Sequence, residues 1–219
     1  MSIEQLWQLR EFKLVHRCGA PAGPCTALRL RPVTAKNTPF GALFDDTSTH
    51  AKSPQFHTHF LKLLPGLLAD DLMQIAFPNA NRFNTGQSNA QGVENDYAVH
   101  FSRGGGSFAQ GMQQQLTALG SDLTPMHLVR RAMTQSCAGC HQLSAFGANS
   151  DLGHELTWPF SLGFVHVDEA GNLSPALRDV FLPHRQAVLE NFLNGTALRV
   201  MIAPDASVEL TIGGLRRTP

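Results

Sequence analysis

Apolar and polar positions alternate along the first part of the chain with the period of a β-strand. The alternation runs from about Trp7 to Val33 on both sides of a turn-rich stretch rich in Gly and Pro, which predicts a β-hairpin. One face of the two predicted strands carries Phe12, Leu14, His16, Leu28 and Leu30. A two-stranded hairpin is too small to be stable alone, so we expect residues 1–52 to belong to a larger region.

Helical spacing of apolar residues replaces this alternation from Ser53-Pro54 onward, where a hydroxyl and a proline at the first helical position predict a helix start. Pro65-Gly66 predicts a kink or a division into two short helices. Residues 78–106 are rich in Asn, Gln, Gly and Ser, and predict a flexible loop. A helix over residues 107–119, stopped by a glycine, completes a predicted helical segment over residues 53–120.

A third predicted segment, residues 121–219, begins with a helix that starts at Thr124-Pro125 and runs directly into residue 137. Arg130 and Arg131 are expected at exposed positions of this helix, within reach of an acidic group of a ligand. Short helices are predicted from residues 174 and 183. The last of these ends near residue 194, before a strand-like stretch at 208–212.

The most informative stretch of the chain is CAGCH at residues 137–141. C-x-x-C-H is the attachment sequence of a c-type haem, in which two thiols add to the haem vinyl groups and the histidine ligates the iron. Cys137 and Cys140 are three residues apart, so one helical turn directs both sulfurs to one side of the macrocycle. His141 would be the proximal ligand, and haem c would be the cofactor.

At this stretch the chain resembles c-type cytochromes. The resemblance implies an incoming N-terminal helix and a C-terminal helix that crosses it, for which the helix after residue 183 is the candidate. The expected fold is therefore α+β and mainly helical, with a cytochrome c-like domain in the third segment. The whole chain also resembles uncharacterised secreted bacterial proteins with a C-terminal CxxCH, which implies no substrate or partner.

The sixth ligand of the iron is open at the sequence level. His166, flanked by apolar residues, is the leading candidate, and Met201 is a weaker one because it follows the last helix, whereas the distal methionine of small cytochromes precedes it. His154, His184 and an open sixth position are further alternatives. Trp158 is a candidate donor to a haem propionate through its indole N–H.

Two other interpretations of the C-x-x-C pair are a redox dithiol and half of a zinc site. A redox dithiol would normally follow a strand of a βαβ unit, and the chain shows no such pattern. A zinc site would normally need a second C-x-x-C, and the chain has none. Cys18 and Cys25 flank the predicted hairpin turn, and could form a disulfide across it or remain unpaired thiols. A bridge there would agree with an oxidising compartment.

The charge and hydropathy of the chain argue against two further classes of protein. The 219 residues carry 17 basic and 17 acidic side chains, a balance that argues against a nucleic-acid-binding protein. No apolar run is long enough to cross a bilayer. The first residues do not read as a secretory signal, yet haem is attached to such motifs outside the cytoplasm in this family. We therefore expect a periplasmic or extracellular protein whose start is truncated.

These observations predict a single-haem c-type cytochrome that transfers one electron at a time to and from a redox partner protein, and that is an electron carrier rather than an enzyme. Two alternatives are a peroxidase-type haem enzyme with an open sixth site, and an extracellular binding or structural protein. In the second alternative, the hairpin and residues 78–106 contact a partner and the haem is secondary.

Overall fold

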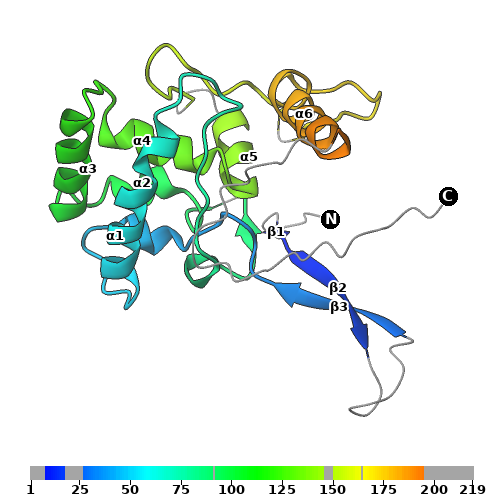
Figure 1. Ribbon diagram of the computed structural model, residues 1–219, viewed down its shortest axis with the longest axis horizontal. Coiled ribbons are helices and arrows are strands. Elements are labelled where there is room, and N and C mark those ends of the chain that lie inside the picture. The colour runs from blue at the N-terminus through cyan, green and yellow to red at the C-terminus, as the bar shows by residue number, and fades with distance from the viewer. Residues whose placement is uncertain (1–7, 18–26, 91, 146–149, 164, 195–219) are drawn as a thin grey trace.

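The computed structural model describes residues 8–17, 27–90, 92–145, 150–163 and 165–194, and has an α+β fold in which helices predominate (Figure 1). Its strands are β1 (Gln8–Leu9), β2 (Glu11–Arg17), β3 (Ala27–Val33) and β4 (Ser88–Asn89). Its α-helices are α1 (Ser53–Leu63), α2 (Tyr97–Phe101), α3 (Ser107–Ala118), α4 (Pro125–Met133), α5 (Cys137–Ala145) and α6 (Leu182–Leu193). None of the helices in these residues is long and apolar enough to span a membrane.

The predicted hairpin is confirmed as β2 and β3, which pair antiparallel and project from the helical body (Figure 1). The register sets Leu14 opposite Leu30 and His16 opposite Leu28, so the predicted apolar face is formed. That face is exposed to solvent, with Leu14 62% and Leu30 66% accessible. The proposed disulfide partners, Cys18 and Cys25, lie outside the described residues.

An aromatic cluster forms the centre of the helical body. Phe44, Phe56 and Phe60 are fully buried and meet one another edge to face or tilted, with ring centroids 5.0 to 5.9 Å apart. Tyr97 of α2 stacks on Phe44 at 4.3 Å, and Phe108 of α3 meets Phe60 at 5.4 Å. Offset and edge-to-face pairs are the favoured aromatic geometries, so these contacts join α1, α2 and α3 into one core.

Residues 78–106, predicted to be a flexible loop, are instead packed into this core over most of their length. They contain α2, the short strand β4 and a 3-10 turn at Asn81–Phe83. Their polar side chains bond inward: the Asn79 amide donates to the Asn84 side-chain oxygen at 2.6 Å, and Asn95 accepts from the Asn89 N–H at 2.8 Å. The prediction was wrong because asparagine side chains form hydrogen bonds with the backbone both in exposed turns and inside a packed core. A composition rich in Asn does not distinguish an exposed loop from a buried segment.

The helix starts at Ser53-Pro54 and Thr124-Pro125 are confirmed. The Thr124 hydroxyl accepts from the His127 N–H, whereas Ser53 is the first helical residue and its hydroxyl is buried without a bond. Beyond α1, residues Leu64–Leu67 form a 3-10 helix at the predicted Pro65-Gly66 interruption. Gly120 follows the C-cap of α3 and has a left-handed φ of 68°, so it stops the helix as predicted.

Three expectations for the third segment need correction. The incoming helix α4 ends at Met133, so the turn Thr134–Ser136 separates it from α5 and from the motif. The last helix, α6, has no buried residue and does not form the predicted crossing with α4. It continues a π-helical turn at Ala176–Phe181, which replaces the two separate helices predicted from residues 174 and 183.

Candidate functional site

The CAGCH motif forms the first turn of α5, and two serines hold that turn in place. The Ser136 hydroxyl accepts from the Gly139 N–H at 3.0 Å, and the Ser88 hydroxyl of β4 accepts from the Ala138 N–H at 2.9 Å. These bonds satisfy two of the donors that a helix start leaves free. β4 pairs in turn with β1, so the N-terminal part of the chain helps to position the motif.

Gly139, between the two cysteines, fits a space that only glycine fills. A Cβ atom added there would lie 2.2 Å from the Met133 carbonyl oxygen and 2.8 Å from the Ser136 hydroxyl oxygen. The turn between α4 and α5 therefore closes tightly against the motif, and any larger residue would push the two helices apart. The glycine is thus explained by packing, whatever binds to the cysteines.

Both motif cysteines are free thiols in environments that disfavour the charged sulfur. Cys137 is exposed on one side, and partial desolvation, with an electrostatic contribution from Glu11, raises its pKa. Burial also raises the pKa of Cys140 to about 11, which the nearby Trp158 only partly opposes. Reactive dithiols act as thiolates, and their thiol pKa values are lowered. The environment of the motif instead suits a neutral sulfur, either a thiol or a thioether.

The structure brings His166, the leading sixth-ligand candidate, directly to the motif. Its Nε2 lies 3.8 Å from the Cys140 Sγ, and its ring centroid lies 4.6 Å from that of His141. The other ring nitrogen, Nδ1, is 2.8 Å from the hydroxyl oxygen of the fully buried Ser174. Burial, followed by the proximity of His141, lowers the pKa of His166, which favours the neutral imidazole.

Trp158, the candidate donor to a haem propionate, lies beside Cys140 of the motif. The residue is only 7% exposed. A hydrogen-bonding contribution from Trp158 lowers the pKa of the Cys140 thiol, so the buried indole N–H lies beside the Cys140 sulfur.

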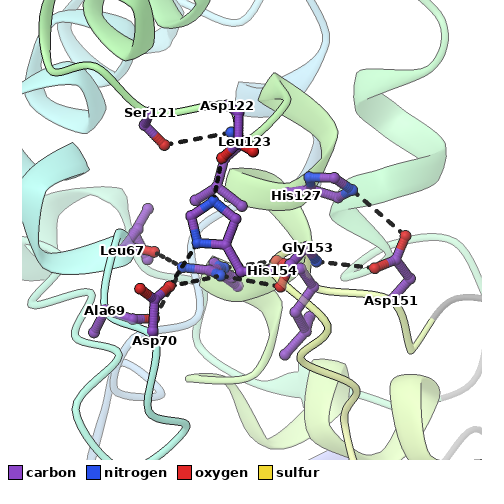
Figure 2. A network of polar contacts seen from close by, with 12 residues as sticks. Leu67, Ala69, Asp70, Ser121, Asp122, Leu123, His127, Asp151, Gly153 and His154 are labelled. Atoms are coloured by element: carbon purple, nitrogen blue, oxygen red, sulfur yellow. Dashed lines mark hydrogen bonds and ion pairs between the residues drawn. The ribbon is translucent and has the colours of Figure 1, made fainter.

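The other candidates for the sixth ligand are placed elsewhere. His184 is exposed on α6. His154 is held by two carboxylates, with Nδ1 2.6 Å from Asp70 and Nε2 2.5 Å from Asp122 (Figure 2). Met201 lies outside the described residues. Among the histidines considered, His166 is therefore the one in contact with the motif.

The helix that precedes the motif is anchored by a buried arginine. Arg131 of α4, predicted to be exposed, is fully buried. Its guanidinium donates to the carbonyl oxygens of Leu67, Ala69 and Leu152 at 2.7 to 2.9 Å, and to that of Gly153 at 3.3 Å. Figure 2 shows how these carbonyls, from two separate segments, converge beside Asp70 and His154. Arg131 thus fixes α4, and the turn after it, against the body.

The sequence did not identify three of the residues that shape the site: Ser88, Arg131 and Ser174. A signal was present only for Ser174, which precedes Pro175 at a predicted helix start, and whose hydroxyl accepts from the Leu177 N–H at 3.1 Å. Nothing local marks Ser88 or Arg131, because their partners lie 50 or more residues away in sequence or are backbone carbonyls of distant loops.

Within the described residues, no three His, Cys, Asp or Glu side chains converge as ligands of one metal ion. Comparison of the chain with protein-family models, curated proteins and solved structures finds no match.

Proposed function

We propose that this protein is a single-haem c-type cytochrome that carries one electron at a time outside the cytoplasm. The observation that carries the proposal is the CAGCH turn of α5, where two neutral thiols and His141 meet a second imidazole, His166. Covalently attached haem would supply an iron that alternates between the ferric and ferrous states. Cys137 and Cys140 would hold the macrocycle, and His141 would be the proximal ligand.

The environment of the sulfurs supports this proposal over a redox dithiol. A thioether is neutral and tolerates the burial that raises the pKa of Cys140, whereas a thiolate pays the cost of desolvation. Trp158, which lies beside Cys140, would be a donor for a propionate through its indole N–H. A redox partner protein would then be required, and its identity is left open.

The test is expression behind a periplasmic signal together with cytochrome c maturation machinery. We expect an intact mass increased by one haem, the sharp absorption bands of a c-type cytochrome, and a reversible one-electron redox titration. The Cys137→Ser/Cys140→Ser variant is the control, and should carry no covalent haem. An unmodified mass for the wild-type chain, with no haem absorption, would refute the proposal.

A further inference from the structure

We propose that the hairpin formed by β2 and β3 is the surface through which this protein binds an anionic lipid membrane. The apolar side chains of one face of the hairpin, Phe12, Leu14, Leu28 and Leu30, enter the headgroup layer. The basic side chains of the other face contact the lipid phosphates. The attachment is peripheral, and it is independent of the proposed haem.

The first observation is an apolar face that the body leaves open. The register of β2 and β3 sets Leu14 opposite Leu30, with Phe12 and Leu28 at neighbouring positions of the same face. These four side chains are 48–66% exposed, and the hairpin that carries them projects from the body (Figure 1). Two strands alone are at best marginally stable in water, so this hairpin gains stability when its apolar face is covered.

The second observation is the positive charge of the opposite face. Lys13, Arg29 and Arg31 are exposed there, and the register sets Lys13 directly opposite Arg31, a placement of like charges that destabilises a sheet. Glu11, the one acidic residue in the sequence of the two strands, accepts from the Lys36 N–H at 2.9 Å. No carboxylate of the described residues forms an ion pair with the three basic side chains. The chain as a whole is neutral, so this charge is a local feature that suits an anionic partner.

The two faces together favour a membrane over a folded protein. A protein packed against the apolar face leaves the basic face unpaired, because the side chains of the two faces point in opposite directions. The headgroup layer of a membrane surrounds a thin hairpin, so apolar side chains reach the acyl chains while long Lys and Arg side chains extend to the phosphates. The free edges of the two strands need hydrogen-bond partners, which headgroups and water supply and hydrocarbon does not. The hairpin therefore lies in the headgroup layer.

The size of the apolar face argues against a second copy of this chain as its partner. A complete aromatic side chain offers at most about 250 Å². Four side chains that are at most 66% exposed therefore offer less than the about 800 Å² that each partner of a specific protein interface buries. Insertion into lipid has no such minimum, since electrostatic attraction to anionic lipid adds to the effect of the buried apolar area.

Helix α6 provides a matched comparison, because its surface is similarly apolar and carries no excess of formal charge. Leu189 and Phe192 are 56% and 64% exposed, values close to those of the hairpin side chains. The one arginine of the helix, Arg185, is balanced by Glu190. α6 therefore has the apolar part of the proposed surface without the basic part.

The experiment measures binding of the full chain to lipid vesicles by cosedimentation. The wild type should bind vesicles of equal parts phosphatidylglycerol and phosphatidylcholine about 100-fold more tightly than vesicles of phosphatidylcholine alone, since each basic side chain near an anionic surface contributes about 1 kcal/mol. High salt should remove most of this difference, because it screens exposed charges. A wild-type chain that binds neither kind of vesicle, or binds both equally, would overturn the proposal, whether a second copy, an acidic protein or residues 195–219 cover the face instead.

Two pairs of substitutions separate the contributions of the two faces. Lys13→Gln/Arg31→Gln should weaken binding to the anionic vesicles by about 30-fold and leave binding to the neutral vesicles unchanged. This pair is repulsive, so its removal does not destabilise the hairpin, and a loss of binding comes from the lost charge. Leu14→Thr/Leu30→Thr should weaken binding to both kinds of vesicle by more than about 10-fold, because it removes inserted apolar groups. Threonine keeps the β-propensity of the strands.

Leu189→Gln/Phe192→Gln in α6 is the control, and it should bind vesicles as the wild type does. Unchanged binding by both hairpin variants, or a loss confined to the α6 variant, would overturn the proposal. Sedimentation of the wild type without vesicles should give a monomer. A dimer that Leu14→Thr/Leu30→Thr dissociates would assign the apolar face to a second copy, and would overturn the proposal too.

Discussion

The body of the molecule, which includes the motif, and the segment that follows it use their apolar residues in opposite ways. Between residues 35 and 158, the described large apolar side chains are almost all in the core, and the exposed ones are Met73, Val93 and Leu119. Between residues 160 and 193, the described chain exposes Phe160, Val165, Val167, Leu173, Phe181, Leu182, Leu189, Phe192 and Leu193. The first region is closed on itself, whereas the second presents apolar surface that the described residues do not cover.

The contrast shows what composition can and cannot reveal. Both regions contain Phe and Leu at helical spacing, yet only the first buries them, because only there do several helices and loops converge from distant parts of the chain. Contiguous exposed apolar patches mark binding surfaces, and α6 alone exposes Leu182, Leu189, Phe192 and Leu193. The motif in α5 lies at the boundary between the two regions (Figure 1).

The largest effect should come from a matched pair of Phe→Ala substitutions, one in each region. Phe60→Ala removes a fully buried ring and should lower the free energy of unfolding by about 3–5 kcal/mol. Phe192→Ala removes a ring that is 64% exposed, and should change the free energy of unfolding by less than about 0.5 kcal/mol. Urea denaturation of the two variants gives both values, and losses of similar size would contradict the contrast.

A smaller effect is expected at the anchor that fixes α4 beside the motif. Arg131→Met removes the donor to four backbone carbonyls, of which Gly153 keeps a bond from the Leu156 N–H. It should cost roughly 3 kcal/mol, since the other three carbonyls lose this donor at about 1 kcal/mol each, the low end of the range for a buried unsatisfied group. Arg130→Met is the control. Arg130 lies next in the helix with an exposed bond to the Asp151 carbonyl, and its substitution should cost under about 1 kcal/mol. Equal urea midpoints for the two variants would show that Arg131 is not an anchor.

The smallest effect concerns pH and the contact between His154 and its two carboxylates. Hydrogen bonds to Asp70 and Asp122 raise the pKa of His154 above its ordinary value of 6.5, so the stability it contributes is present below that value and is lost as the pH rises through the folded-state pKa. The bond with His154 lowers the pKa of Asp122 below 3.8, so that contribution is lost in acid.

The contact should therefore stabilise the body most between about pH 4 and pH 6.5, and less above that range. The difference in urea midpoint between the wild type and His154→Gln should shrink as the pH rises from 6 toward 9. His184→Gln, at an exposed site, should show no such trend. A difference that stays constant over this range would show that His154 does not titrate with folding.

The local features of the fold could be predicted from the sequence. Alternation in the hairpin predicted which residues share a face, and the pairing of Leu14 with Leu30 confirms it. Thr124-Pro125 and Gly120 marked a helix start and a helix stop correctly. These predictions depend on hydrogen bonds and dihedral angles within a few residues, which local sequence determines.

The long-range features could not be predicted in the same way. Arg131 reads as an exposed helical residue, and it is buried because carbonyls from two distant segments converge on it. Residues 78–106 read as a polar loop, and they are ordered because their asparagines bond to one another inside the body. No local pattern reports such partners, because they are brought together only when the core forms.

For this protein, the sequence by itself determined the hairpin and the helix starts, and it marked CAGCH as the candidate site, because each depends on neighbouring residues or on residue type. The tertiary structure alone decided that Cys140 lies in an environment that raises its pKa, that Arg131 anchors α4, and that His166 rather than His154 meets the motif. The physical reason is that burial and long-range contacts depend on how separate segments pack together. The sequence around one residue does not report which distant segments will pack against it.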